Sequence, residues 1–169
     1  MLTRGKVAIA AASLVATGGL IVGAEASGQP TGGVFHWYEY APPTTVPGRI
    51  ILTGAISDHG LDRGGVAGPN HTYNKLVLTK GSFEVNAGKL KVHQHLDTRS
   101  CTLVVHGSGP MPIVKGSGTG AYQGITGTSR AKTGFVGVFP KKADGSCNMN
   151  AQPKTGFGWS SAVGRSSLR

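Results

Sequence analysis

The chain has 169 residues, including 28 glycines and 9 prolines, and its formal net charge at pH 7 is +10. This length suits one domain with a hydrophobic core and is too short for two. Glycine far exceeds its usual fraction of about 7%, but it follows no Gly-x-y period, which excludes collagen. Apolar residues are ordinary in amount and spread along the chain, which argues against disorder. The positive charge either favours anionic partners or only keeps an exported protein soluble.

Residues 1–26 have the pattern of a secretory signal peptide. Arg4 and Lys6 precede an apolar run over residues 7–22, and Ala24-Glu25-Ala26 provides the small residues that a signal peptidase requires. We therefore predict cleavage after Ala26 and a secreted mature protein, with a net charge lower by one unit. An uncleaved membrane anchor is the alternative, but the run is shorter than the roughly 20 residues of a membrane span.

The remaining chain has the pattern of an all-β protein, because no stretch places apolar residues at helical spacing. Short alternating runs predict about eight antiparallel strands separated by glycine and proline turns. We expect a flexible lead-in over 27–48 with one strand at 34–40, a β-domain over 49–164 and a frayed basic tail over 165–169. Strands are expected at 49–56, 72–79, 82–92, 101–106, 111–115, around 132–135 and 154–157, and at 159–163. Residues 57–69, 94–100 and 107–110 are expected to be connections.

A glycine-rich stretch over residues 115–129 reads KGSGTGAYQGITGTS. Glycine inside strands marks bends and close backbone approach, so we predict two short strands that meet at a corner near residues 118–124. A sheet that closes into a barrel needs such corners. A dinucleotide-binding loop is excluded because the residues that follow favour extended chain rather than the required helix.

This corner, with Tyr122 before Gly124, resembles the glycine corner of the allene oxide cyclase and dirigent barrels. From about Gly48 to Val163 the chain resembles secreted actinobacterial proteins of the same barrel group, above all at 50–60, 74–78 and 81–86. The resemblance implies a single closed antiparallel barrel with room for one modest ligand, and it permits dimers or trimers. This bacterial group has no assigned activity. The interior carboxylate and asparagine of the cyclases, and the paired acidic residues of dirigent proteins, do not align onto this chain.

Two cysteines, Cys101 and Cys147, lie in the mature part of the chain. An even number of cysteines in an exported protein predicts one disulfide. A catalytic thiol and a metal ligand are the alternatives, and neither cysteine has a Cys-x-x-Cys neighbour.

Three titratable residues are candidates for acid–base catalysis. Asp58 and His59 could form an orienting carboxylate and a proton-transfer group, or they could only stabilise a loop. Glu84 lies in a half-apolar strand, where it either faces a barrel interior that raises its pKa or faces water. His71, Phe83 and Tyr122 are the candidate ligand-binding residues. His93 and His95 share a strand face and could bind a metal, but no third ligand is evident and we predict no metal site.

These features predict a secreted barrel that binds a small, partly apolar ligand or an anionic cell-surface polymer without catalysis. The alternative is a cofactor-free isomerase or cyclase of the allene oxide cyclase type, with Glu84, Asp58 and His59 acting in the barrel mouth. No cofactor is expected in either case. Nucleic acid ranks last as a partner because few exposed aromatics are expected beside the basic residues.

Overall fold

A computed structural model describes residues 32–43 and 47–168. The predicted signal peptide, residues 27–31 and 44–46 of the predicted lead-in, and Arg169 lie outside the described residues. Within them the protein is all-β, as expected, and contains no α-helix. The described part of the chain therefore has no helix that is long and apolar enough to cross a membrane.

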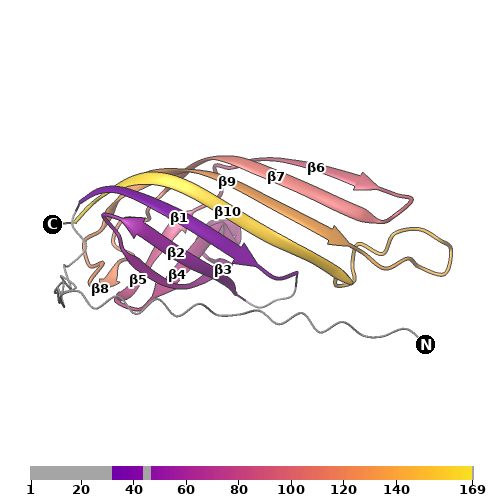
Figure 1. The fold of residues 1–169 in the computed structure, drawn as a ribbon, viewed down its shortest axis with the longest axis horizontal. Helices are drawn as coiled ribbons and strands as arrows, with labels where there is room; N and C mark the ends of the chain where they lie inside the picture. Colours follow the sequence, from indigo (N-terminus) through magenta and orange to yellow (C-terminus); the bar gives the residue numbers. More distant parts are fainter. Residues whose placement is uncertain (1–31, 44–46, 169) are drawn as a thin grey trace, which may run out of the picture.

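Ten strands form one antiparallel sheet (Figure 1), in the order β6-β7-β9-β10-β1-β2-β3-β4-β5-β8. A short 3-10 turn, η1 (Pro69–His71), lies between β3 and β4. The strands are β1 (Gly33–Ala41), β2 (Gly48–Gly54), β3 (Asp58–Ala67), β4 (Tyr73–Leu78), β5 (Gly81–Asn86), β6 (Lys91–Asp97), β7 (Thr102–Pro112), β8 (Thr119–Gly120), β9 (Thr126–Val138) and β10 (Thr155–Ser167).

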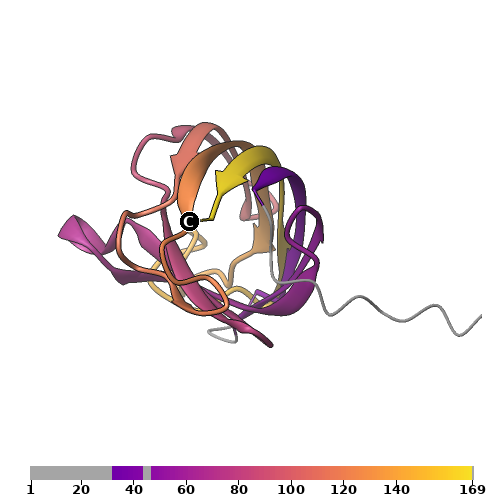
Figure 2. The ribbon, with the colours of Figure 1, turned by 90° about the vertical axis from the view of Figure 1, so that its left-hand side faces the viewer.

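The predicted closed barrel of about eight strands is wrong in strand number and in closure. Seen end-on, the sheet curls round on itself (Figure 2), but its strand order has two edges, β6 and β8. Across the gap, an isolated bridge joins Val85 to Ile113, the Val114 amide donates a hydrogen bond of 2.8 Å to the Glu84 carbonyl, and the Glu84 amide donates one of 2.9 Å to the Ser117 hydroxyl. The long strand β9 pairs with β7 on one side and with β10 on the other, and these three strands extend past the short strands β4, β5 and β8. The ladder of backbone hydrogen bonds therefore remains open.

The strand boundaries differ from the expected ones mainly in the predicted connections. β7 runs without interruption through residues 107–110 and so merges two expected strands, whereas β3 is an additional strand that fills most of the expected connection 57–69. Likewise, β6 occupies most of 94–100, and β10 continues to Ser167, into the expected tail. The lead-in strand is β1, which lies between β10 and β2 inside the sheet. By contrast, the glycine corner is confirmed as a turn, since the two-residue strand β8 leads through it into β9.

The concave side of the curled sheet holds the hydrophobic core. Alternation along each strand sends Phe35 and Trp37 of β1, Ile50 and Leu52 of β2, and Phe83 of β5 inward, where all are almost completely buried. Their sequence neighbours on the same strands face outward. Each strand residue therefore points either into this interior or to the convex outer face. The first kind can contact an enclosed ligand, and the second kind can contact solvent or a binding partner.

The predicted disulfide between Cys101 and Cys147 is present, and no free cysteine remains. It ties the turn between β6 and β7 to the long connection between β9 and β10 (residues 139–154), across a sequence separation of 46. The bridge therefore restrains a connection that has little secondary structure of its own.

Replacing both cysteines by alanine should lower the free energy of unfolding by about 3 kcal/mol, because the unfolded chain regains the freedom of a long closed loop. Urea unfolding measures this loss, and hydrogen exchange should show faster opening of residues 139–154. Wild-type protein treated with a reductant should match the double variant. An unchanged urea midpoint in both samples would contradict the prediction.

Candidate functional site

Asp58, a predicted catalytic residue, is the buried centre of a hydrogen-bond network. Its carboxylate accepts hydrogen bonds from the Tyr122 hydroxyl at 2.6 Å, from the Thr79 hydroxyl, and from the backbone amides of His59, Thr79 and Lys80 at 2.7, 3.2 and 3.0 Å. Burial is the largest influence on its pKa and raises it, but the hydrogen bonds together hold the pKa below its usual value. Asp58 thus fastens the glycine corner to the turn between β4 and β5. Five donors occupy its two carboxylate oxygens, so neither oxygen is free to take up a proton as a base.

The predicted acid–base residues are not brought together. His59 follows Asp58 on β3, so its side chain lies on the outer face while Asp58 is buried. Glu84 stands between Phe83 and Val85, whose side chains both point inward, so the Glu84 side chain faces outward. Its partner in the β4–β5 ladder is Lys75. The structure therefore does not bring the side chains of Asp58 and His59 together, and it does not place Glu84 in the interior.

The predicted ligand-binding aromatics are part of the packed core. Tyr122 and Phe83 meet edge to face, with ring centroids 5.3 Å apart and an interplanar angle of 64°. Both are fully buried, and the Tyr122 hydroxyl is occupied by Asp58, which raises the tyrosine pKa together with the larger effect of burial. His71 ends the 3-10 turn η1. We find no ligand-binding arrangement at Tyr122 and Phe83.

A separate interior cavity of about 230 Å³ lies toward the other end of the curled sheet. Its apolar wall includes Leu90 from the β5–β6 connection, Met111 of β7 and Phe135 of β9. Its polar lining comes from the adjacent strands β9, β10 and β1 and from β4: Thr133, Ser160, Glu39 and Asn74. The cavity therefore combines a hydrophobic wall with a small group of hydrogen-bonding side chains, as ligand sites do.

Glu39 of β1 lines this cavity and also contacts a second carboxyl group, that of Asp62 on β3. The two are here called the carboxyl pair. β2 runs between them, and Glu39 reaches across it because Gly48 has no side chain; a Cβ there would collide with the Glu39 carboxyl. Gly48 is also the direct partner of Asp62 in the ladder. On its other oxygen Glu39 accepts a hydrogen bond of 2.6 Å from the Ser160 hydroxyl.

Asp62 is 2% exposed and accepts one hydrogen bond of 2.9 Å, from the Asn74 amide to Oδ2. Its Oδ1 receives no donor from any fixed N–H or O–H. Burial is the main cause that raises the pKa of Asp62, to about 8, and the charge and hydrogen bonding of Glu39 add to it while Asn74 opposes it. Near neutral pH Asp62 therefore keeps its proton, which can bridge to Glu39.

Sequence reasoning missed both members of the carboxyl pair, although one signal was present. In β1, Glu39 shares its face with Phe35 and Trp37, so the inward position of Glu39 follows from period-two alternation once that face is known to be the core. Asp62 gave no such signal, because residues 57–69 were taken as a polar connection.

Among residues 32–43 and 47–168, no three His, Cys, Asp or Glu side chains gather to hold a metal ion. The carboxyl pair with Asn74 offers hydrogen-bonding groups and a retained proton. The chain matches no family model, no curated protein and no solved structure. The resemblance to the allene oxide cyclase and dirigent barrels therefore remains a prediction.

Proposed function

We propose that the protein binds a small, partly apolar ligand in the interior cavity, with the polar group of that ligand hydrogen-bonded to the carboxyl pair. The observation that carries this proposal is a buried aspartate that stays protonated against Glu39, which in turn lines a cavity with an apolar wall. Ligand sites typically combine an apolar lining with a few polar groups of this kind. Secretion, as predicted from the sequence, would expose such a site to small molecules outside the cell.

The ligand should be compact and should carry a hydroxyl or carbonyl group. The cavity is smaller than the 300–1,000 Å³ typical of sites for drug-sized molecules. A carboxyl pair that shares one proton can both donate and accept, which matches an alcohol or a ketone. Leu90, Met111 and Phe135 would contact the hydrocarbon part.

Cyclohexanol tests this proposal as a probe, with cyclohexane as the purely apolar comparison. We expect cyclohexanol at millimolar concentration to shift the methyl NMR signals of Leu90 and Met111, and to bind more tightly than cyclohexane. Leu90→Trp should fill the cavity and abolish the shifts, whereas Val163→Trp on the outer face should leave them unchanged. Equal shifts in both tryptophan variants, or none in the wild type, would refute the proposal.

One observation favours a second candidate, cofactor-free isomerisation by proton transfer. A carboxyl whose pKa lies near neutrality can take and return a proton at physiological pH, as a general acid or base must. In this case Asp62 acts as the base, and the groups predicted from the sequence, Glu84 and the Asp58–His59 pair, take no part.

Exchange of the α-protons of cyclohexanone for deuterium in heavy water separates binding from proton transfer. If the site is catalytic, the wild-type protein should exchange them faster than buffer, and Asp62→Asn should return the rate to that of buffer. Glu84→Gln, on the outer face, is the matched control and should retain the wild-type rate. Exchange at the buffer rate in all three samples would leave ligand binding alone as the function.

A further inference from the structure

The outer face of β1 and β10 carries exposed aromatic rings. Tyr38 and Tyr40 are 54% and 55% exposed, and Phe157 and Trp159 are 43% and 37% exposed. Tyr40 pairs directly with Trp159 across the two strands and stacks on Phe157, with ring centroids 6.4 Å apart and an interplanar angle of 19°. Large exposed rings in one patch are unusual on a monomeric surface and mark an interaction site.

Trp159 lies flat against the neighbouring strand. Its partner on β9 is Gly134, and a Cβ at that glycine would come within 2.5 Å of the indole Nε1 and 2.7 Å of Cε2. Only glycine therefore lets the indole rest on the sheet with its other side toward solvent. The result is a flat ring surface rather than a side chain that projects into water.

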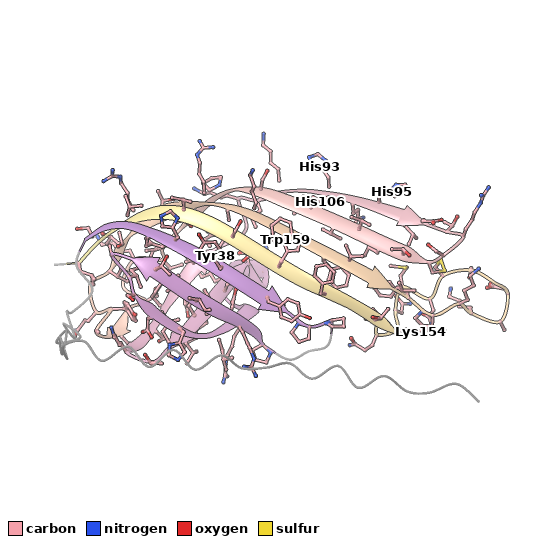
Figure 3. All side chains as sticks on the ribbon, in the orientation of Figure 1. Tyr38, His93, His95, His106, Lys154 and Trp159 are labelled. Atoms are coloured by element: carbon pink, nitrogen blue, oxygen red, sulfur yellow. A yellow bond between two sulfur atoms is a disulfide. The ribbon has the colours of Figure 1, made fainter. Side chains whose placement is uncertain are left out.

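Basic side chains lie directly beyond these rings. Lys91 and His93 of β6, His106 of β7 and Lys132 of β9 line a shallow hollow together with Trp159. In the ladders, His93 faces His106, and His106 faces Gly134. Figure 3 shows Tyr38, Trp159, His106 and His93 in succession across the sheet, from β1 to β6.

Carboxylates are nearly absent from this side of the molecule. Of the six that the structure describes, Glu39, Asp58 and Asp62 face the interior, Glu84 lies on β5 and Asp144 in the β9–β10 connection. Asp97, at the end of β6, accepts hydrogen bonds from the Ser100 hydroxyl and the Arg99 amide. The chain thus places half of these acids inside and presents an almost purely cationic face, which Arg49, Arg130 and Arg165 extend.

We propose that this aromatic–basic face (Tyr38, Tyr40, Phe157, Trp159, Lys91, His93, His106 and Lys132) binds an acidic polysaccharide. The apolar C–H side of a pyranose ring can lie on a flat indole or phenol, and the lysines then pair with carboxylate or sulfate groups along the polymer. The rings and basic side chains of this face lie on the outer side of the sheet, and Trp159 alone among them also belongs to the lining of the cavity. Polysaccharide binding on the outer side does not require a ligand in the cavity.

Charge argues against a second copy of the chain as the occupant. Two such faces pressed together would bring Lys91, Lys132 and their symmetry mates into contact without carboxylates to pair them, and like charges at an interface disfavour association. The disulfide further indicates an oxidising compartment, where polysaccharides are more abundant polyanions than nucleic acid. The exposed rings do, however, remove the reason for which nucleic acid was ranked last, so single-stranded DNA belongs in the test.

The test measures binding of the full-length protein to polygalacturonate by biolayer interferometry, with dextran as the neutral polymer and a thymidine 20-mer as the nucleic acid. We expect polygalacturonate to bind at least about tenfold more tightly than dextran or the 20-mer, and binding to weaken as salt rises from about 50 to 300 mM. Trp159→Ala should weaken binding about tenfold and Trp159→Phe less. Lys91→Ala combined with Lys132→Ala should weaken binding and flatten the salt dependence.

Two controls keep the outcome decisive. Lys75→Ala and Lys80→Ala together remove the same charge from β4 and its following turn, and should leave polygalacturonate binding nearly unchanged. Amide NMR spectra should show that each variant is folded. The proposal is overturned if the two double-lysine variants lose affinity equally, if Trp159→Ala binds like the wild type, or if dextran or the 20-mer binds as tightly as polygalacturonate. The proposal is also overturned if sedimentation shows that the wild type is a dimer and Trp159→Ala is a monomer, because the face would then serve self-association.

Discussion

Replacing Asp58 by alanine is expected to destabilise the protein by about 4 kcal/mol at pH 7. The substitution leaves the buried Tyr122 hydroxyl and the Lys80 amide without their acceptor. It also releases the Thr79 hydroxyl and amide. Each unsatisfied group costs about 1–3 kcal/mol when it remains buried, and some will recover water at the molecule's edge. The loss should separate the glycine corner from the β4–β5 turn before the rest of the sheet opens.

Urea unfolding of Asp58→Ala, with hydrogen exchange of residues 115–125, measures this effect. Asp144→Ala is the matched control, because Asp144 also accepts hydrogen bonds from a nearby amide and hydroxyl, both of Ser146, but lies in an exposed turn. That control should leave the urea midpoint nearly unchanged. A similar midpoint for both alanine variants would show that the Asp58 network does not hold the corner.

The same network predicts how wild-type stability responds to acid. The folded-state pKa of Asp58 is below its unfolded value, so the folded state binds the proton less tightly. The stabilisation is therefore complete above about pH 4 and is lost as the pH falls through the lowered folded pKa. Asp58→Asn should remove this acid-dependent part, and the slope of stability against pH below 4 should become shallower.

Local patterns in the sequence predicted those parts of the fold that depend on one strand or one turn. The glycine corner around Tyr122 and the pairing of Cys101 with Cys147 each follow from residue type and compartment. Period-two alternation along β1 is enough to place Tyr38 and Tyr40 on one face and Phe35, Trp37 and Glu39 on the other, as the structure does. What the sequence could not supply was the strand register, which sets Trp159 beside Tyr40 and places His106 one strand beyond Gly134.

The candidate site escaped prediction because it breaks the usual rule for charged residues. Asp62 lies among glycines and charged residues, a composition typical of a connection, and yet it is buried within β3. Burial of a carboxylate is unfavourable without a partner, so nothing in its own neighbourhood indicated it. Glu39 makes burial possible by sharing a proton, and it comes from a strand some twenty residues earlier through the space left by Gly48.

Asp62→Asn is expected to stabilise the protein at alkaline pH. The folded-state pKa of Asp62 is about 8, whereas its usual value is 3.8, so the folded state retains a proton that the unfolded chain releases between these values. Wild-type stability should therefore fall as the pH rises from about 4 to 8 and level off above it, with a total change on the order of 6 kcal/mol. Asparagine cannot ionise, and its amide can donate to Glu39 while its oxygen accepts from Asn74.

Urea unfolding of the wild type and Asp62→Asn from pH 4.5 to 9 measures this difference. The two proteins should have similar free energies of unfolding near pH 4.5. As the pH rises toward 8, the free energy of unfolding of the variant should exceed that of the wild type by a growing amount. Glu39→Gln should move the wild-type transition to lower pH, because it removes the neighbouring charge that helps to raise the pKa of Asp62. Glu84→Gln, which changes a carboxyl on the outer face, should leave the transition in place. A constant stability difference across this range would mean that Asp62 is already ionised in the folded protein, and the shared proton on which ligand recognition depends would then be absent.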